Sequence, residues 1–286
     1  MNFEERLNEI YTEPQLPAEL SEKYIIISCL KYNDEKQVYL IKDKTDNNKY
    51  ILKCAHNEYS ALIYKEYELL KKAEKLINCP KPVSCITSED ICFLIKEFID
   101  GETLKERVDK EVLSDGEIIG IISKLCTDIE KLHSLNPPII LRDIKPENIV
   151  AADGEYILID FDASREYDEE ASSDTEYVGT RATAAPEQFG YSQTDARTDV
   201  YAIGMLMLYM KTGSFNRDIS VSSNLDKIIR KCIEFSPSGR YNSVSELKKA
   251  LNFKSKKPIS LLITTLIVLI KRKKKSLLGN LSCSLL

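Results

Sequence analysis

The chain has 286 residues, of which 43% are hydrophobic and 30% are charged, a composition typical of a soluble globular protein with a buried core. Its formal net charge of -5 argues against a nucleic-acid partner, because a phosphate backbone calls for a basic surface. Protein or small-molecule partners fit this composition better.

The first part of the chain predicts a small sheet with a helix. Residues 1–23 are polar and contain prolines, and they are interpreted as a leader. From Tyr24 to Cys54, β-rich runs alternate with polar turns, which predicts three strands in a meander. The next stretch, Glu58 to Ile77, carries apolar residues such as Leu62, Leu69 and Leu70 at helical spacing, and Ile91 to Ile99 predicts a further strand.

The pattern turns helical after the Asp100-Gly101 turn. Two short strands, residues 148–150 and 156–159, flank an Asp153-Gly154 hairpin turn. The predicted helices are Glu117–Leu135, Asp199–Lys211, Asn224–Phe235 and Ser243–Leu251. The sequence therefore predicts an α+β fold with a small sheet-plus-helix lobe over residues 24–99 and a helical lobe over residues 101–251.

The tail, residues 252–286, differs from the rest of the chain. Ile259 to Ile270 is uncharged and mostly aliphatic, and the basic run Lys271 to Lys275 follows it. A membrane span needs about 20 apolar residues, and this run is shorter. One interpretation is a short membrane anchor whose basic flank faces anionic lipid. The other is a C-terminal helix packed on the domain, or a tail altered by truncation. Both stay open.

The eight cysteines contain no C-x-x-C pair, and no N-terminal signal segment is recognised. They are interpreted as reduced, mostly buried thiols of a cytosolic protein. A metal site built from Cys79, Cys85 and Cys92 is the alternative, although their spacing matches no zinc pattern.

Four short motifs occur in a fixed order along the chain. They are Tyr50-Ile51-Leu52-Lys53-Cys54, Leu141-Arg142-Asp143-Ile144-Lys145-Pro146-Glu147-Asn148, Asp160-Phe161-Asp162 and Ala185-Pro186-Glu187. Together they resemble four features of protein kinases. In chain order these are the strand that carries the nucleotide-binding lysine, the catalytic loop, the aspartate that binds the metal ion, and the end of the activation segment. The resemblance covers Tyr24 to about Leu251 and is greatest to bacterial Ser/Thr kinases, through residues 184–190 and 195–199. It implies the two-lobed protein kinase fold, with ATP bound between the lobes.

The resemblance also implies chemical roles for the catalytic loop. Asp143 would accept or orient the proton of the substrate hydroxyl, and Lys145 would balance charge on the transferred phosphoryl group. Asn148 and Asp160 would ligate the metal ion, with Mg²⁺ expected and Mn²⁺ as the alternative. Lys145 followed by Pro146 is similar to the Ser/Thr-directed form of this loop.

The nucleotide site follows from the same resemblance. Lys53 would hold the α and β phosphates and pair with a carboxylate of the following helix, for which Glu66 is preferred over Glu58 and Glu68. The remaining residues assigned to the nucleotide are Val38 and the backbone groups of Glu97 and Ile99. Just before them stands Lys96, whose stem can pack while its head reaches Glu66 or solvent.

The sequence departs from the family pattern at several positions. Lys31, Asn33 and Lys36 stand where the phosphate-covering loop would have glycines, which would otherwise let backbone N–H groups approach the phosphates. The two lysines would compensate by charge. Asp162 replaces the glycine of D-F-G, and we expect this carboxylate to face solvent rather than to assist the metal. Leu141 replaces a histidine.

The resemblance also implies two structural roles and one regulatory role. Asp199 would lie in the buried helix that braces the catalytic loop, and Arg240 would pair with Glu187. The segment before residue 180 offers four hydroxyls whose phosphorylation would be read by Arg142, namely Ser172, Ser173, Thr175 and Tyr177.

The function implied is therefore transfer of the γ-phosphoryl group of ATP to protein hydroxyls, including those of the chain's own activation segment. The kinase domain would lie in the cytoplasm, attached to the inner face of the membrane if the tail is an anchor. Two alternatives stay open: a pseudokinase that binds partners, favoured by the missing glycines, and a kinase-like phosphotransferase for small molecules, favoured by the two aspartates of Asp160-Phe161-Asp162.

Overall fold

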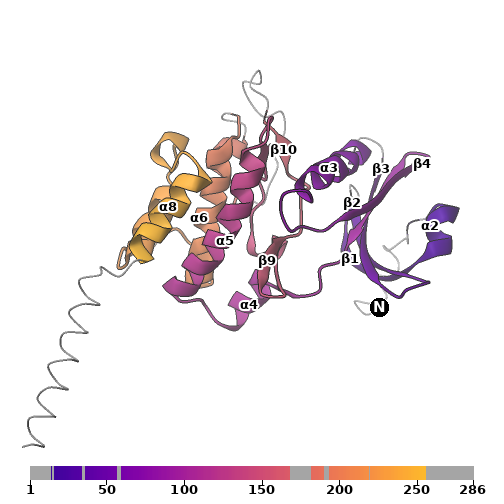
Figure 1. The fold of residues 1–286 in the computed structure, drawn as a ribbon, viewed down its shortest axis with the longest axis horizontal. Helices are drawn as coiled ribbons and strands as arrows, with labels where there is room; N and C mark the ends of the chain where they lie inside the picture. Colours follow the sequence, from indigo (N-terminus) through magenta and orange to yellow (C-terminus); the bar gives the residue numbers. More distant parts are fainter. Residues whose placement is uncertain are drawn as a thin grey trace, which may run out of the picture.

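The computed structural model describes residues 14, 16–33, 36–56, 59–167, 182–189, 193–218 and 220–255, without the side chains of 253–255. Two lobes lie side by side (Figure 1), one built around a sheet and one mostly helical. The α+β, two-lobed fold expected from the sequence is confirmed. The ends of the predicted domain, residues 24–251, stay a prediction.

The smaller lobe is a five-stranded antiparallel sheet with a helix on each face, in the strand order β1-β2-β3-β5-β4. Its elements are α2 (Ala18–Lys23), β1 (Tyr24–Tyr32), β2 (Lys36–Asp43), β3 (Lys49–His56), α3 (Ser60–Ala73), β4 (Pro82–Ser88) and β5 (Ile91–Glu97). One face packs with α2 through Leu20, Tyr39 and Phe93, and the other packs with α3. The sheet therefore has one face that looks toward the larger lobe and one that does not (Figure 1).

Three lysines lie on the face that looks toward the larger lobe. Residues directly opposite in an antiparallel ladder share a face, as do alternate residues along one strand. Lys36 of β2 is opposite Ala55, and Lys96 of β5 is opposite Ile51. Because Ile51, Lys53 and Ala55 alternate along β3, the register places Lys36, Lys53 and Lys96 on one face.

The predicted strand meander is present, but two details differ from the expectation. Helix α3 is shorter than predicted, and Leu62, assigned to its apolar face, is 45% exposed. Strand β4 was not predicted. It lies at the edge of the sheet, begins at a proline and exposes Val83, so it lacks the long apolar run that marks a central strand.

The larger lobe is built on the long helices α5 and α6. Its elements are β6 (Glu102–Thr103), α4 (Leu104–Lys110), α5 (Asp115–His133), β7 (Ile139–Ile140), η2 (Pro146–Asn148), β8 (Ile149–Ala152), β9 (Glu155–Leu158), β10 (Arg165–Glu166), η3 (Pro186–Phe189), α6 (Ala196–Thr212), α7 (Asn224–Cys232), η4 (Pro237–Gly239) and α8 (Val244–Ser255). Capping boxes begin α4, α5, α6 and α7 and fix where these helices start. Helix α6 is buried over nearly its whole length.

Gly204 lets α6 approach the end of α7 closely. A Cβ added there would lie 2.5 Å from the Cβ of Cys232. We expect Gly204→Ala to lower the free energy of unfolding by about 1–3 kcal/mol, because a packed core cannot take the added methyl group without shifting. Gly120→Ala is the matched control, since an added Cβ on that α5 residue meets nothing within 4 Å and should stabilise by about 0.4–1 kcal/mol. Urea unfolding measures both, and equal stability of the two variants would contradict the expectation.

Within the part of the chain that the structure describes, no helix combines the length and the apolar character that a membrane crossing requires. The aliphatic run Ile259–Ile270 and its basic flank lie outside the described residues.

Candidate active site

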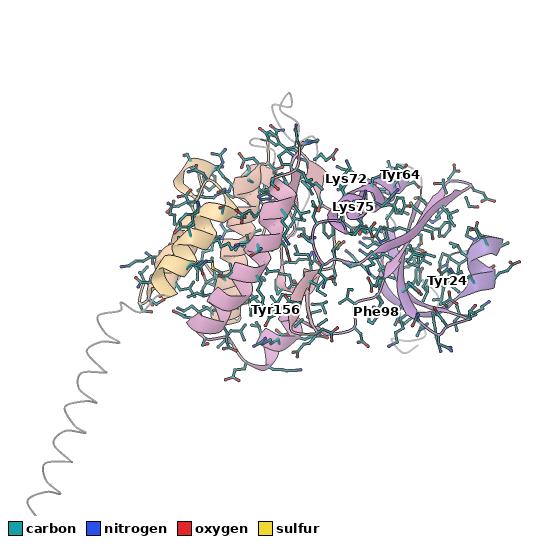
Figure 2. The ribbon with its side chains drawn as sticks, in the orientation of Figure 1. Tyr24, Tyr64, Lys72, Lys75, Phe98 and Tyr156 are labelled. Atoms are coloured by element: carbon teal, nitrogen blue, oxygen red, sulfur yellow. The ribbon has the colours of Figure 1, made fainter. Side chains whose placement is uncertain are left out.

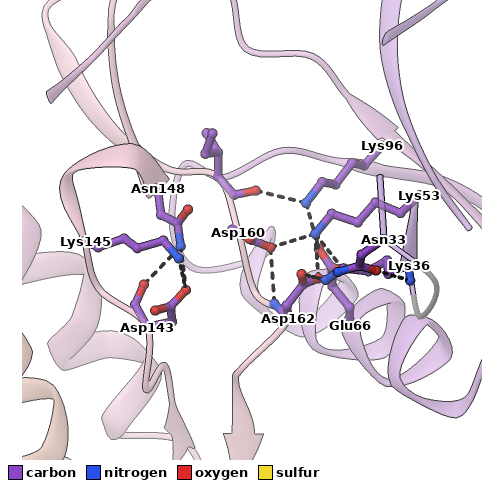
Figure 3. Close-up of polar contacts among 11 residues, drawn as sticks. Asn33, Lys36, Lys53, Glu66, Lys96, Asp143, Lys145, Asn148, Asp160 and Asp162 are labelled. Atoms are coloured by element: carbon purple, nitrogen blue, oxygen red, sulfur yellow. Dashed lines mark hydrogen bonds and ion pairs between the residues drawn. The ribbon is translucent and has the colours of Figure 1, made fainter. Parts of the chain in front are cut away.

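Lys53 and Glu66 form a buried ion pair beneath the sheet (Figure 3). Lys53 Nζ donates to Glu66 Oε1 at 2.8 Å and to Oε2 at 2.9 Å. Glu66 points inward because it lies on the apolar face of α3, one turn from Ile63 and Leu69. Burial alone would raise the pKa of Glu66, but the ammonium groups of Lys53 and Lys96 outweigh it and hold that pKa below its ordinary value.

The two other candidate partners of Lys53 are not in this position. Glu68 is half-buried and lies 4.0 Å from Lys71 on the same helix. Glu58 lies outside the described residues. The contact expected between Lys53 and Glu66 is therefore present.

Lys96 joins the same carboxylate from the neighbouring strand β5. Its Nζ donates to Glu66 Oε1 at 2.7 Å and to the carbonyl oxygen of Ile159 at 2.9 Å. The residue is 2% exposed, and burial lowers the pKa of Lys96 despite the neighbouring carboxylate. Of the two positions open to its head, contact with Glu66 and contact with solvent, the structure shows the first.

Asp160 and Asp162 approach Lys53 from the larger lobe, on the loop that follows β9. Lys53 Nζ donates to Asp160 Oδ1 and to Asp162 Oδ1, both at 2.6 Å. Burial would raise the pKa of Asp160, and Lys53 more than offsets this, so the pKa lies well below its usual range. The expectation that Asp162 faces solvent is wrong: its side chain is only 25% exposed, because two lysines attract it into the cleft.

The second of these lysines is Lys36, at the start of β2. Its ammonium group forms an ion pair with Asp162. Burial, and then repulsion by Lys53, lower the pKa of Lys36 to about 8. The backbone N–H of Lys36 is already used, since it donates to Asn33 Oδ1 at 2.6 Å. Asn33 and Lys36, two of the positions where the family has glycine, thus close their own hairpin.

The catalytic-loop residues form a second cluster, drawn on the left of Figure 3. Lys145 Nζ donates to Asp143 Oδ2 at 2.6 Å. Asn148 Nδ2 donates to the same carboxylate oxygen and to the Asp143 carbonyl, both at 3.1 Å. This arrangement turns the amide oxygen of Asn148 away from Asp143, toward the side of the cleft where Asp160 lies (Figure 3).

Asp199 holds the backbone of this loop in place. Its carboxylate accepts from the backbone N–H groups of Leu141 at 2.9 Å and Arg142 at 2.8 Å. Arg142 has a φ of 68°, a left-handed conformation that costs energy for a residue with a Cβ. His133 of α5 also bonds Asp199, at 2.7 Å. The bracing role expected of Asp199 is thus visible as hydrogen bonds to a strained turn.

The expected pair of Glu187 and Arg240 is present in the larger lobe. Arg240 donates to the two carboxylate oxygens at 2.7 and 2.8 Å. A contact that sequence reasoning missed is Gln188, whose amide donates to the Arg142 carbonyl at 2.9 Å and so ties this segment to the catalytic loop. Its position directly after Ala185-Pro186-Glu187 was the available signal. The hydroxyls of Ser172, Ser173, Thr175 and Tyr177 lie outside the described residues.

The remaining residues assigned to the nucleotide lie on the sheet and at the joint between the lobes. Val38 is half-buried and stands opposite Lys53 in the sheet. The backbone N–H of Glu97 donates to the Lys81 carbonyl at 2.9 Å, so at Glu97 the carbonyl is the group left for an adenine edge. Ile99 is half-buried, and its neighbour Phe98 marks the segment that joins the lobes in Figure 2.

The acidic side chains fit a divalent metal. Within the described ranges, Glu66, Asp160 and Asp162 form the one group of carboxylates, thiols or imidazoles close enough to share an ion, their ligand atoms lying within 4.8 Å of one another. Glu66 is already held by two lysines, so Asp160 and Asp162 are the more accessible members. Oxygen donors of this kind suit Mg²⁺ and Mn²⁺. The three cysteines considered from the sequence do not form such a group, although Cys85 Sγ and Cys92 Sγ are 3.5 Å apart.

The site has the arrangement that defines the protein kinase class. A buried lysine-glutamate pair lies beneath a small sheet with an aspartate beside it, and a braced Asp-x-Lys-x-x-Asn loop lies across the cleft. A family model described as the protein kinase domain matches residues 34–268, and the chain belongs to this family. Use of ATP with a divalent metal ion is characteristic of this family.

The relatives found are bacterial Ser/Thr kinases. Serine/threonine-protein kinase D of Synechocystis sp. is 32% identical over 216 residues, which are 67% of this chain and 42% of that protein. A probable serine/threonine-protein kinase of Clostridium perfringens is 28% identical over 248 residues, 77% of this chain and 34% of the relative. Serine/threonine-protein kinase PknB of Mycobacterium tuberculosis is 24% identical over 272 residues, 82% and 43% of the two chains. This chain thus matches less than half the length of each.

Proposed function

We propose that the chain is a Ser/Thr protein kinase that transfers the γ-phosphoryl group of ATP to hydroxyls of protein substrates. The observation that carries this proposal is the cluster of Asp143, Lys145 and Asn148 facing the cluster of Lys53, Glu66 and Asp160 across one cleft (Figure 3). Phosphoryl transfer depends on positioning and charge stabilisation, and these two clusters supply both.

Each residue has a defined task in this proposal. Asp143 orients the substrate hydroxyl and takes its proton, while Lys145 neutralises charge near the transferred group. Lys53 binds the α and β phosphates, and Glu66 positions Lys53. Asp160 and Asn148 hold the divalent cation, which supplies positive charge to the phosphates and is Mg²⁺ by preference, with Mn²⁺ as a substitute of the same ligand chemistry.

The adenine end of the nucleotide falls to the sheet and the joint between the lobes. Val38 lies beside Lys53 on the sheet and covers the base, and the Glu97 carbonyl and the backbone of Ile99 bond its polar edge. Lys96 fills the space behind it, since its head is fixed on Glu66.

Lys145 followed by Pro146 supports serine and threonine as acceptors, and the hydroxyls at 172–177 are candidate sites of self-phosphorylation. The basic run after Ile259–Ile270 supports attachment of a cytoplasmic kinase domain to the inner face of the membrane. Vesicle sedimentation with anionic and with neutral lipids tests this attachment, and equal binding of the full chain and of a chain ending at residue 255 would contradict it.

Transfer of radiolabel from ATP tests the central proposal. The protein is incubated with γ-labelled ATP and Mg²⁺, with and without a basic protein substrate, and the labelled amino acid is identified after acid hydrolysis. We expect phosphoserine or phosphothreonine, and we expect chelation by EDTA to remove the label. Label on a sugar or aminoglycoside but on no protein would favour the small-molecule alternative. Nucleotide binding without any transfer would favour the pseudokinase alternative.

A further inference from the structure

Two departures from the protein kinase pattern touch each other. Lys36 stands where the phosphate loop would have its last glycine, and Asp162 stands where D-F-G has glycine. The two side chains form an ion pair that joins β2 of the small lobe to the loop after β9 of the large lobe. Two unusual residues that meet across the cleft are better explained by one shared task than by two unrelated changes.

The side chain of Lys36 is the group that faces the phosphate region. Register places Lys36 on the same sheet face as Lys53, and Lys53, Asp160 and Glu66 all act on its charge. Its backbone N–H donates to Asn33 Oδ1 and so cannot cradle a phosphate, as the backbone of a glycine loop does. What this hairpin offers to an anion is therefore the ammonium group.

The charges around Lys53 balance before any ligand arrives. Among the described residues, the ion pairs link the lysines Lys36, Lys53 and Lys96 to the carboxylates Glu66, Asp160 and Asp162. A metal nucleotide brings both phosphate charge and cation charge into this network. Each incoming charge needs a side chain of opposite charge. Such a side chain becomes available only when one of the existing ion pairs separates.

The pairs differ in how easily they open. Lys53 and Glu66 have side chains 5% and 0% exposed, so separating them would strand a buried charge. Lys36 and Asp162 are 21% and 25% exposed, so water reaches both groups and their attraction is weaker. The outer pair is the one that a ligand can separate.

We propose that Lys36 is a second phosphate-binding lysine and that Asp162 is an additional ligand of the divalent cation, the two being paired with each other only while the nucleotide is absent. This inference rests on the proposed function and deepens it. On binding, Lys36 exchanges Asp162 for a phosphate oxygen, and Asp162 exchanges Lys36 for the cation, so that neither charge is left alone. The lysine side chain thereby replaces the backbone contacts of the missing glycine loop.

Binding of inorganic tripolyphosphate and of ATP to the full chain tests the role of Lys36, measured by calorimetry with and without Mg²⁺. We expect Lys36→Met to weaken Mg²⁺-ATP and tripolyphosphate binding about tenfold, the effect of losing one charge-assisted contact of ~1.4 kcal/mol. Lys36→Arg should keep most of the affinity. The matched control is Lys42→Met, on the same strand and face but at its other end, which should bind as the unchanged protein does.

Asp162 is tested by the dependence of ATP binding on metal. Without Mg²⁺, Asp162→Asn should tighten ATP binding several-fold, because it frees Lys36 and removes a negative charge near the phosphates. With Mg²⁺ the gain should disappear, since one cation ligand is lost. In the double variant with Lys36→Met, the metal-free gain should become smaller, because only the removal of the Asp162 charge is left to produce it. Thermal unfolding of each variant shows that the protein is folded when it is assayed.

Two results would overturn the inference: equal binding by Lys36→Met and Lys42→Met, or metal-free ATP affinity unchanged by Asp162→Asn. Its failure is separable from that of the proposed function. A protein that transfers phosphate but binds ATP independently of Lys36 refutes only this inference. A protein that binds tripolyphosphate through Lys36 but transfers nothing refutes only the kinase proposal.

Discussion

Asp143→Asn should lower the rate of phosphoryl transfer by about 10²–10⁴-fold, the usual contribution of a positioned general base. The amide keeps the size of the carboxylate but cannot take the proton of a substrate hydroxyl. Asp143 contacts Lys145 and Asn148 rather than the lysines beneath the sheet, so the ATP dissociation constant should stay near its original value. Initial rates at saturating ATP and calorimetry of ATP binding measure the two quantities.

Asp153→Asn is the matched control for this prediction. Asp153 is exposed in the turn between β8 and β9 and has a φ of 51°, a left-handed conformation that Asn adopts readily. The same chemical change at this position should leave transfer unchanged. If Asp143→Asn is as active as Asp153→Asn, Asp143 is not the base.

Glu66→Gln should lower the free energy of unfolding by about 3–5 kcal/mol, because removing one member of a buried ion pair strands the other. Two buried lysines share this carboxylate, and the substitution changes charge without creating a cavity. Transfer should also fall, since Lys53 loses the group that positions it. Glu68→Gln on the half-buried side of the same helix is the control and should change stability by less than about 1 kcal/mol.

A second substitution tests whether the loss of stability in Glu66→Gln comes from an unpaired ammonium group. Without Glu66, Lys53 still has Asp160 and Asp162, whereas Lys96 keeps only the Ile159 carbonyl among its contacts described above. Lys96→Met in the Glu66→Gln background should therefore recover a large part of the lost stability in urea unfolding. If the double variant is less stable than Glu66→Gln alone, the stranded ammonium group is not the cause.

Much of the fold followed from local patterns in the sequence. The alternation from Tyr24 to Cys54 and the helical spacing before Leu135 predicted β1, β2, β3 and α5, because burial on one face imposes these periods. Strand β4 escaped prediction because an edge strand carries a weaker apolar signal. The residue order of the motifs predicted which side chains gather in the cleft, although it gave no distances.

The direction of single side chains was harder to predict. Asp162 was expected to face solvent, and the two lysines that attract it lie far away in sequence, on β2 and β3. The competition between Glu66, Glu58 and Glu68 could be argued from helix periodicity, since Leu69 and Leu70 mark the buried face. Contacts within one element are encoded locally, whereas a contact between lobes depends on the complete fold.

Lys96 has a consequence for inhibitor chemistry. Behind the segment assigned to the adenine edge stands a buried ammonium group, bonded to Glu66 and to the Ile159 carbonyl. An uncharged aromatic group that displaced Lys96 would leave the ammonium without its carboxylate, at a desolvation cost of several kcal/mol. Selective compounds for this chain should instead stop short of Lys96 or present an acceptor to it.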